Sequence, residues 1–188
     1  MSLNLYMGPM FSGKTSAALQ LIDTYVRRDE SFLCITSSLD NRYSESGGKL
    51  VSHDLESRDA VAVDSLLPLL DSDDFLNANY IIIEEAHFFP DLKAFVLHAV
   101  EDLGKHITCI GLNGDFRRKP FGELLDLVPY CNSITKFKSI CMMCPKESAV
   151  RDGLFTHRIV DESKQAFVGG KNEYESLCRF HYLEKTRL

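Results

Sequence analysis

The sequence lacks several features that mark whole classes of protein. No apolar run among its 188 residues reaches the roughly 20 residues that span a membrane, so we expect no membrane partner. Residues 1–4 lack a charged segment followed by a long apolar stretch, so no secretory signal is predicted. Internal repeats and low-complexity segments are also absent from the sequence. We therefore expect a cytoplasmic protein.

The sequence also has no excess of basic over acidic residues. The formal net charge is −6, whereas proteins that bind duplex nucleic acid usually carry a basic face, so nucleic acid is not an expected partner. Six cysteines without an export signal indicate thiols in a reducing compartment, not disulfides. The composition, 45 % hydrophobic and 26 % charged, is that of one globular domain with a small appendage.

The most informative stretch that is present is a phosphate-binding pattern. Residues 8–15 have the P-loop form Gly-x-x-x-x-Gly-Lys-Ser/Thr, between a strand-like run at 3–7 and a helix-like run from Ser16. In such a loop Lys14 meets the β and γ phosphates and Thr15 offers a hydroxyl to Mg²⁺. The alternative is a glycine-rich turn with an unrelated lysine. The predicted ATP-phosphate ligands here are Gly8, Pro9, Met10, Phe11, Ser12, Gly13, Lys14 and Thr15.

Strand-like and helix-like segments alternate over the first 138 residues. Residues 37–58 have no clear period and are expected to form a long loop. The alternation predicts a parallel sheet with helices on both faces and ligands at the carboxyl ends of its strands. Strands are expected at 31–36, 59–63, 80–83, 106–111 and 133–137, and helices at 65–70 (capped by Asp64 or Ser65), 89–103 and 120–128.

A second chemical centre follows the most apolar strand. Glu84 and Glu85 come directly after residues 80–83, which is the Walker B arrangement of an acid after a buried strand. One carboxylate can hold Mg²⁺ and the other can act as a base toward an acceptor hydroxyl; the alternative is two solvated loop carboxylates. His87 is a candidate base, although a lone histidine here is more often a hydrogen-bonded wall residue.

Aromatic and basic residues also lie just past predicted strand ends. Phe88, Phe116 and Phe121 are placed to sandwich a base or, more simply, to pack the loops. The basic run 117–119 either contacts phosphate or forms a solvated face.

Cysteine spacing sets the last fifty or so residues apart. Cys141 and Cys144 form a C-x-x-C pair, and Cys178 and His181 form a C-x-x-H pair. Two such pairs predict a structural Cys₃His zinc site, the alternative being unrelated thiols and a surface histidine. Cys34 and Cys109 lie in apolar strand-like runs and are expected in the core. Cys131 has no evident place.

Over residues 3–183 these motifs resemble the cytosolic, type II thymidine kinase family. Residues 8–15 resemble its own form of the P-loop, in which Met and Phe precede Ser-Gly-Lys. Residues 40–44 resemble its Asp-x-Arg-Tyr motif, and residues 84–89 resemble its Asp-Glu-(Ala/Gly)-Gln-Phe-Phe motif. Residues 111–122 resemble its Gly-Leu-Asp-Gly-x-Phe motif, and residues 155–174 resemble the loop called the lasso.

The resemblance implies a fold, a reaction and partners. The fold is a P-loop NTPase (RecA-like) α/β domain over 1–138, with a small zinc-anchored lasso domain over 139–188 that closes over the nucleoside. The reaction is transfer of the γ-phosphate of ATP, bound with Mg²⁺, to the 5′-hydroxyl of thymidine. Members of the family work as homotetramers and are inhibited by thymidine triphosphate.

The resemblance also implies residue roles. Glu85 stands where the family has its catalytic base, Thr15 and Glu84 stand at the Mg²⁺, and Arg42 lies near the phosphates. Nine residues line up with the nucleoside pocket: Met10, Phe88, Leu112, Phe116, Phe121, Thr156, Phe167, Gly169 and Tyr174.

This chain departs from the family pattern in a few places. Glu84 and Asn113 each replace an aspartate, His87 replaces a glutamine, and extra residues lie within 145–154. None of these changes removes a catalytic group.

Rival functions stay open at this point. One is another deoxynucleoside kinase, and a second is a P-loop ATPase whose zinc ribbon binds nucleic acid. A catalytically inactive regulator is disfavoured because Lys14, Thr15 and Glu85 are intact.

Overall fold

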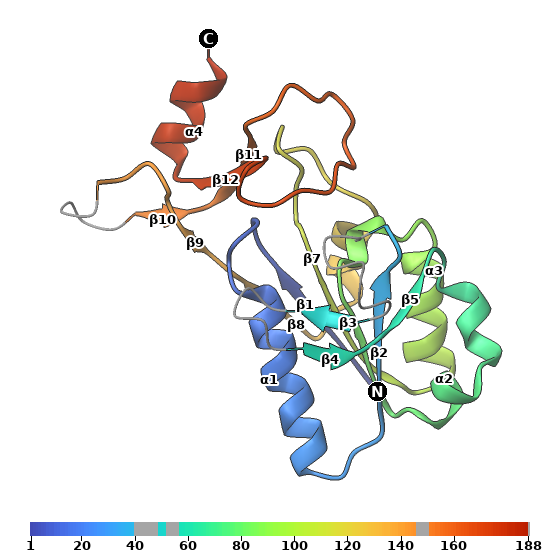
Figure 1. Cartoon of the computed structure of the whole chain (residues 1–188). Helices are drawn as coiled ribbons and strands as arrows, with labels where there is room; N and C mark the ends of the chain where they lie inside the picture. Colours follow the sequence, from blue (N-terminus) through green and yellow to red (C-terminus); the bar gives the residue numbers. More distant parts are fainter. Residues whose placement is uncertain (40–48, 52–56, 146–150, 188) are drawn as a thin grey trace.

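The structure is a computed structural model that describes residues 1–39, 49–51, 57–145 and 151–187. A six-stranded sheet forms its centre, with strands in the order β5-β2-β6-β7-β1-β8 (Figure 1). Every neighbouring pair in this sheet is parallel, as the sequence predicts. The strands are β1 (Ser2–Met7), β2 (Phe32–Ser37), β5 (Val61–Val63), β6 (Tyr80–Ile83), β7 (His106–Gly111) and β8 (Ser133–Lys136).

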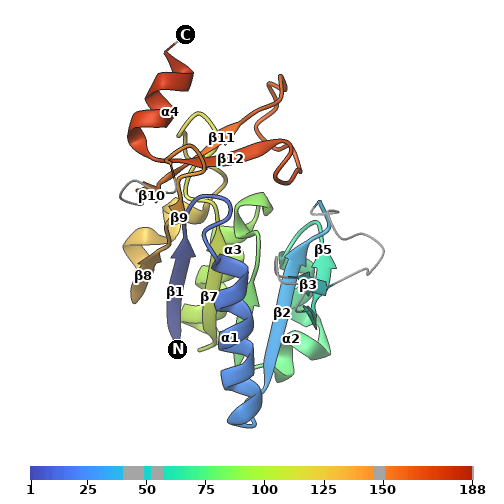
Figure 2. The same ribbon diagram turned by 60° about the vertical axis from the view of Figure 1, so that its left-hand side comes forward.

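Helices cover both faces of the sheet (Figures 1 and 2). On one face α1 (Lys14–Arg27) buries Ala18, Leu19 and Ile22 against side chains of β2, β6 and β7. On the other face Phe75 of α2 (Asp73–Asn77) and Phe95 of α3 (Leu92–Leu97) lie in the larger apolar cluster. Because the central strands are covered on both sides, β6 is apolar throughout its buried part. The predicted arrangement of layers is confirmed.

Several predicted boundaries are wrong. The helix expected over 89–103 begins only at Leu92 and ends in a π-helical turn, η4 (His98–Asp102). The segment expected to be helical over 120–128 is a 3₁₀ helix, η5 (Leu124–Tyr130). Part of the expected loop over 37–58 is a short antiparallel pair, β3 (Lys49–Val51) with β4 (Ser57–Asp59).

The cap predicted for the helix at 65–70 is also wrong. This segment is the 3₁₀ helix η2 (Leu67–Asp71), and neither Asp64 nor Ser65 caps it through a side chain. Instead Oδ2 of Asp91 accepts the backbone N–H groups of Leu66 and Leu67, at 2.8 Å each, and the Ser65 hydroxyl. Burial opposes ionisation of Asp91, but these bonds outweigh it and hold its pKa below the ordinary value.

After β8 the chain builds a smaller assembly beyond the carboxyl edge of the sheet (Figure 1). Its buried cluster consists of Cys141, Leu177, Cys178 and Tyr182. Residues 159–173, which join β11 to β12, are called the lasso below. The elements are β9 (Ser139–Ile140) paired with β10 (Asp152–Gly153), β11 (Phe155–Arg158) paired with β12 (Tyr174–Leu177), and α4 (Arg179–Thr186).

Within the described ranges, no helix combines the length and apolar character that a membrane crossing requires. All six cysteines lie in these ranges and are free thiols. Cys34 and Cys109 are buried in the sheet core, as expected, and Cys131 is half-buried with its thiol directed at the carbonyl of Val128.

Candidate active site

Residues 8–15 connect the carboxyl end of β1 to α1. Gly13 adopts φ +80° at the helix N-cap, a left-handed conformation that favours glycine. A Cβ on Gly8 would lie 2.7 Å from the carbonyl oxygen of Phe137, so a side chain has no room there. Lys14 is the first residue of α1, and its Nζ donates to the carbonyl of Pro9 at 2.7 Å. The lysine therefore points back across the loop, where the positive end of the helix is also directed.

The two residues predicted to hold Mg²⁺ meet directly. The hydroxyl of Thr15 donates to Oε1 of Glu84 at 2.6 Å, although 69 positions separate them in sequence. Glu84 is 5 % exposed and follows β6, which is separated from β1 by β7 in the sheet. A buried carboxylate beside a hydroxyl is a donor set of oxygen atoms, which Mg²⁺ prefers. Glutamate stands here where the resemblance implies an aspartate, and its longer side chain reaches Thr15.

Glu85 turns the chain away from the sheet. Its backbone is left-handed, with φ 51° and ψ 37°, and it begins the 3₁₀ helix η3 (Ala86–Phe88). Left-handed non-glycine residues are uncommon and cluster at functional sites, which agrees with the predicted role of Glu85. Its Oε2 lies 3.6 Å from Nδ1 of His87, and its side chain is 14 % exposed.

His87 is a wall residue, the second of its two predicted roles. Nδ1 accepts the backbone N–H of Leu112 at 3.2 Å, and because an N–H can only donate, this nitrogen carries no proton. The ring is 2 % exposed and packs between Phe88 and Phe121, with centroids 4.3 and 4.5 Å away. The neutral imidazole therefore holds Phe88 and Phe121 in place, and these three rings are called the aromatic wall below.

The predicted nucleoside residues come from four segments at one edge of the sheet (Figure 2). These are residues 8–15, η3, residues 112–121 and the stretch from β11 to β12. The backbone N–H of Met10 donates to Oγ1 of Thr156 at 3.0 Å, which joins residues 8–15 to β11. Leu112 and Phe116 lie in the segment after β7, and Phe88 and Phe121 share the aromatic wall. Arg42 falls outside the described residues.

The lasso backbone is held by Tyr174, the first residue of β12. Tyr174 is 5 % exposed, and its hydroxyl donates to the carbonyl of Phe167 at 2.6 Å. Gly169 leaves space that Glu173 fills, since a Cβ there would lie 2.8 Å from that side chain. The hydroxyl of Tyr174 therefore fixes the lasso backbone in this structure.

Asp115, Arg158 and Gln165 carry contacts at this edge, although no role was predicted for them from the sequence. Arg158 is 6 % exposed and lies with its guanidinium 3.8 Å from the ring centroid of Phe116. The burial alternates along β11, with Thr156 and Arg158 on its buried side. The sequence 155–158 has no matching alternation of apolar and polar residues, because its apolar residue, Phe155, lies on the other side of the strand, so no local signal marked Arg158 as buried.

The basic run 117–119 is exposed, as its reading as a solvated face predicts, and its two arginines also make specific contacts. The guanidinium of Arg118 lies over the rings of Tyr182 and Phe155, 4.7 and 5.5 Å from their centroids. Arg117 donates from Nη2 to the carbonyl of Ser163 at 3.0 Å. These two arginines fasten the segment after β7 to the C-terminal assembly.

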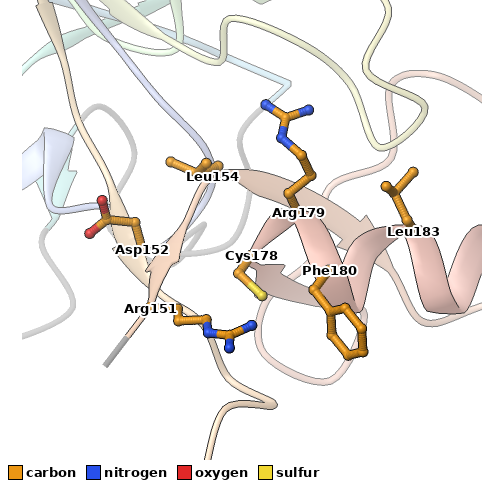
Figure 3. Close-up of a pocket in the computed structure, with 7 residues that line it drawn as sticks. All are labelled: Arg151, Asp152, Leu154, Cys178, Arg179, Phe180 and Leu183. Carbon is orange, nitrogen blue, oxygen red and sulfur yellow. The ribbon is translucent and has the colours of Figure 1, made fainter. Parts of the chain in front are cut away.

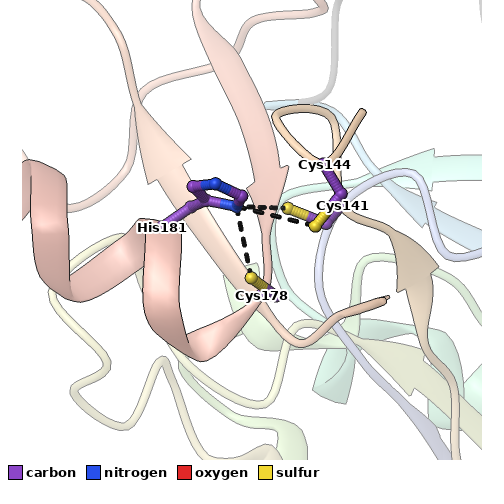
Figure 4. Close-up of side chains that lie close together, drawn as sticks. All are labelled: Cys141, Cys144, Cys178 and His181. Carbon is purple, nitrogen blue, oxygen red and sulfur yellow. Dashed lines mark hydrogen bonds between the residues drawn. The ribbon is translucent and has the colours of Figure 1, made fainter. Parts of the chain in front are cut away.

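The cysteine and histidine pairs converge on one point (Figure 4). All four ligand atoms lie within 4.8 Å of one another. Nδ1 of His181 is 3.4, 3.6 and 3.3 Å from the sulfurs of Cys141, Cys144 and Cys178. Ligands of a tetrahedral zinc ion, at about 2.3 Å for sulfur and 2.1 Å for nitrogen, stand roughly 3.5–3.8 Å apart. The cluster therefore fits zinc.

The thiols themselves favour a cation. Burial works against ionisation of Cys141, but backbone N–H groups at Cys178 and Met143, helped by His181, lower its pKa to about 6. Burial and the neighbouring sulfurs of Cys141 and Cys178 raise the pKa of Cys144 to about 11. Ionisation of Cys141 is favoured while that of Cys144 is opposed, and a bound cation would relieve this opposition.

An open pocket of about 570 Å³ lies beside α4 (Figure 3). None of its lining residues belongs to residues 8–15, to the two acids or to the aromatic wall, so it is not the phosphoryl-transfer site. It is lined by Arg151, Asp152, Leu154, Cys178, Arg179, Phe180 and Leu183.

Comparison with known proteins agrees with this geometry. The sequence model of the family described as thymidine kinase matches residues 1–182. The chain is 36 % identical to the thymidine kinase of Yaba monkey tumor virus over 182 residues, which cover 97 % of this chain and 94 % of the viral one. It is 33 % identical to human cytosolic thymidine kinase over 184 residues, 98 % of this chain and 74 % of the human one. For the thymidine kinase of Variola virus the identity is 34 % over 182 residues, 97 % of each chain. With the family pattern matched over nearly its whole length, the chain belongs to the thymidine kinase family.

Proposed function

We propose that the chain transfers the γ-phosphate of ATP to the 5′-hydroxyl of thymidine, with Glu85 as the base. The observation that carries this assignment is the 2.6 Å bond between Thr15 and Glu84, because it brings the phosphate loop and the acids after β6 to one place. Residues 8–15 hold the phosphates of ATP, and Lys14 supplies positive charge beside them. Arg42 is assigned to the phosphates on the family resemblance alone.

The two acids divide the work. Thr15 and Glu84 would hold Mg²⁺, which when bound with ATP neutralises charge on the phosphates. Glu85 accepts the proton of the 5′-hydroxyl. His87 is not available for this task, because its Nδ1 already accepts the N–H of Leu112. Most of the rate enhancement is expected from positioning and electrostatics.

The nucleoside lies against the aromatic wall and beneath the lasso. Backbone groups near Phe167 and Gly169 read the base edge, and Tyr174 holds them in place through its bond to Phe167. The other wall residues are Met10, Phe88, Leu112, Phe116, Phe121 and Thr156. Closure of the lasso excludes water from the transfer step.

The remaining features of the proposal follow the resemblance. Residues 1–138 form the ATP-binding part, and residues 139–188 form the part that closes over the nucleoside, with a structural zinc on Cys141, Cys144, Cys178 and His181. The protein is a cytoplasmic homotetramer that thymidine triphosphate inhibits.

The test is a phosphorylation assay with ATP and each of the four deoxynucleosides. We expect thymidine to be the preferred acceptor. Lys14→Ala removes the positive charge and should lower turnover by far more than tenfold, without changing the thermal unfolding of the protein. A tenfold loss corresponds to about 1.4 kcal/mol in the activation barrier. Preference for another deoxynucleoside, or more than a tenth of the turnover in Lys14→Ala, would contradict the proposal.

A further inference from the structure

The segment after β7, residues 112–120, is called the β7 loop here, and it holds a buried carboxylate with one oxygen facing the lasso. Asp115 is 5 % exposed. Its Oδ1 accepts the backbone N–H groups of Arg117 and Lys119, both at 2.8 Å. The backbone N–H of Asp115 donates to the carbonyl of Lys119, and its own carbonyl accepts the N–H of Arg118, each at 2.9 Å. The loop therefore fixes this carboxylate without any contribution from the lasso.

The second oxygen of Asp115 bonds to the lasso. Nε2 of Gln165 donates to Oδ2 of Asp115 at 2.8 Å and to the carbonyl of Pro120 at 3.2 Å. Both partners can only accept, so the nitrogen of the amide must face them. Both amide hydrogens of Gln165 are therefore directed at the β7 loop, one of them toward an ionised acceptor, which gives the stronger kind of hydrogen bond.

The main chain of Gln165 is fastened separately. Its carbonyl accepts Nη2 of Arg158 at 3.0 Å, while Nη1 of Arg158 donates to the carbonyls of Glu162 and Lys164 at 2.7 and 2.5 Å. Arg158 also donates to the hydroxyl of Tyr174. Arg158 thus sets the shape of the lasso by bonding its backbone, and Gln165 sets where the shaped loop lies on the β7 loop.

We propose that Gln165 is a positioning residue that latches the lasso to Asp115 and thereby holds the lasso backbone over the nucleoside. The inference rests on the proposed nucleoside-binding role of the lasso. Gln165 is two residues from Phe167 and four from Gly169, so its attachment restrains both. Holding a loop in its bound position reduces the ordering cost that the nucleoside must otherwise overcome. The latch acts on thymidine affinity and leaves the phosphate end of the site unchanged.

The first test removes the latch in Gln165→Ala. We expect the KM for thymidine to rise about tenfold, equivalent to about 1.4 kcal/mol, while kcat and the KM for ATP stay within about threefold. Lys171→Ala is the matched control, because Lys171 is an exposed residue of the same lasso, and it should leave all three constants within about twofold.

The second test exchanges donor and acceptor. Gln165→Glu sets two carboxylates against each other and should raise the KM for thymidine at least as much as Gln165→Ala. Adding Asp115→Asn keeps an oxygen for the N–H groups of Arg117 and Lys119 and presents an amide donor to the new carboxylate. The double variant should recover at least about threefold of the lost KM, which a general loss of structure would not allow.

The outcomes separate the latch from the proposed function. A KM for thymidine within twofold of wild type in Gln165→Ala, an equal rise in the KM for ATP, or a double variant no better than Gln165→Glu would each overturn the latch. Trypsin cleavage after Lys164 and Lys171 in the wild-type protein tests the lasso itself. Lack of protection by thymidine would refute the nucleoside role of the lasso. Protection together with an unchanged KM in Gln165→Ala would refute only the latch.

Discussion

The sheet buries apolar side chains on both of its faces, whereas the C-terminal assembly buries very few. The sheet core contains large fully buried side chains such as Phe75, Phe89 and Phe95. Among the described residues, the C-terminal cluster has four buried members, and two of them, Cys141 and Cys178, belong to the zinc set. Fully burying a large apolar side chain contributes about 1.5–3 kcal/mol, so the sheet has ample stability of its own. The smaller assembly is therefore expected to depend on the metal that its Cys₃His cluster fits.

Over the described part of the chain, the contacts between the sheet and the C-terminal assembly are hydrogen bonds and ring stacking, and they involve neither a large apolar core nor a metal cluster. The hydroxyl of Tyr182 donates to the carbonyl of Phe116 at 2.7 Å, Arg118 stacks on Tyr182, and Met10 donates to Thr156. Burial raises the pKa of Tyr182 above its ordinary value, so its hydroxyl remains a donor at neutral pH. Polar and stacking contacts allow the regions to separate without exposing a large apolar surface. This suits the proposed function, in which a rigid edge carries the chemistry and the C-terminal assembly opens for the nucleoside.

The largest expected effect comes from the rigid edge. Glu85→Gln keeps the volume of the side chain but removes the proton acceptor, so kcat should fall by about 10²–10⁴-fold with little change in the KM for ATP. Thermal unfolding should be unchanged, because the left-handed backbone and the core are retained. The control is Glu101→Gln, an exposed carboxylate of η4, which should not alter kcat. If Glu84→Gln abolishes turnover while Glu85→Gln is mild, the two acids have the opposite roles.

The second prediction compares the loss of a core side chain in the sheet with the loss of a zinc ligand in the C-terminal assembly. Phe95→Ala removes a fully buried ring and should lower the free energy of unfolding by about 3–5 kcal/mol across the whole sheet. Cys141→Ser removes one zinc ligand and should reduce bound zinc from one ion per chain to almost none. Hydrogen exchange should then accelerate in β12 and α4 while β6 and β7 stay protected.

Two results would break the comparison. Loss of protection in β6 equal to that in β12 after Cys141→Ser would mean that the two regions unfold together. Metal analysis of the wild-type protein that finds no zinc would remove the basis for treating the C-terminal assembly as metal-dependent.

The sequence predicted those parts of the molecule whose chemistry is local. The pattern at residues 8–15, the acids after 80–83 and the two cysteine-containing pairs each fall within a few positions, and the structure places the predicted partners Thr15 and Glu84 in contact. The continuous apolar run of β6 identified a strand covered on both faces.

The features that sequence reasoning missed depend on residues far apart in the chain. Asp91 caps η2 from more than twenty positions away, so no local cap was visible. Arg118 is an ordinary surface arginine by sequence, and only the fold brings Phe155 and Tyr182 beneath it. The five-residue helix α2 was also missed, because it is held by the burial of Phe75 and is too short to show a helical period.

The smallest expected effect concerns the contact between the regions. Arg118→Ala removes the stacking on Tyr182 and Phe155, which at an exposed position contributes about 0.5–1 kcal/mol. Hydrogen exchange in β11 and β12 should quicken by about two- to fivefold, while β6 and β7 stay unchanged. Arg118→Lys should recover only part of the protection, because it restores the charge without the planar guanidinium. Arg118 has a left-handed backbone, φ 62°. Alanine and lysine keep about the same backbone strain there as arginine, whereas glycine would relieve it and confuse the comparison.

Arg28→Ala serves as the control, because Arg28 is an exposed arginine at the C-cap of α1, and the C-terminal end of α1 lies far from β11 and β12 (Figure 1). It should leave exchange in β11 and β12 at the wild-type rate. The comparison between the regions predicts a graded response, in which losing Arg118 loosens the assembly slightly and losing a zinc ligand unfolds it. If Arg118→Ala instead matches Cys141→Ser in its effect on β12, then contact with the sheet, and not the metal, holds the C-terminal assembly together.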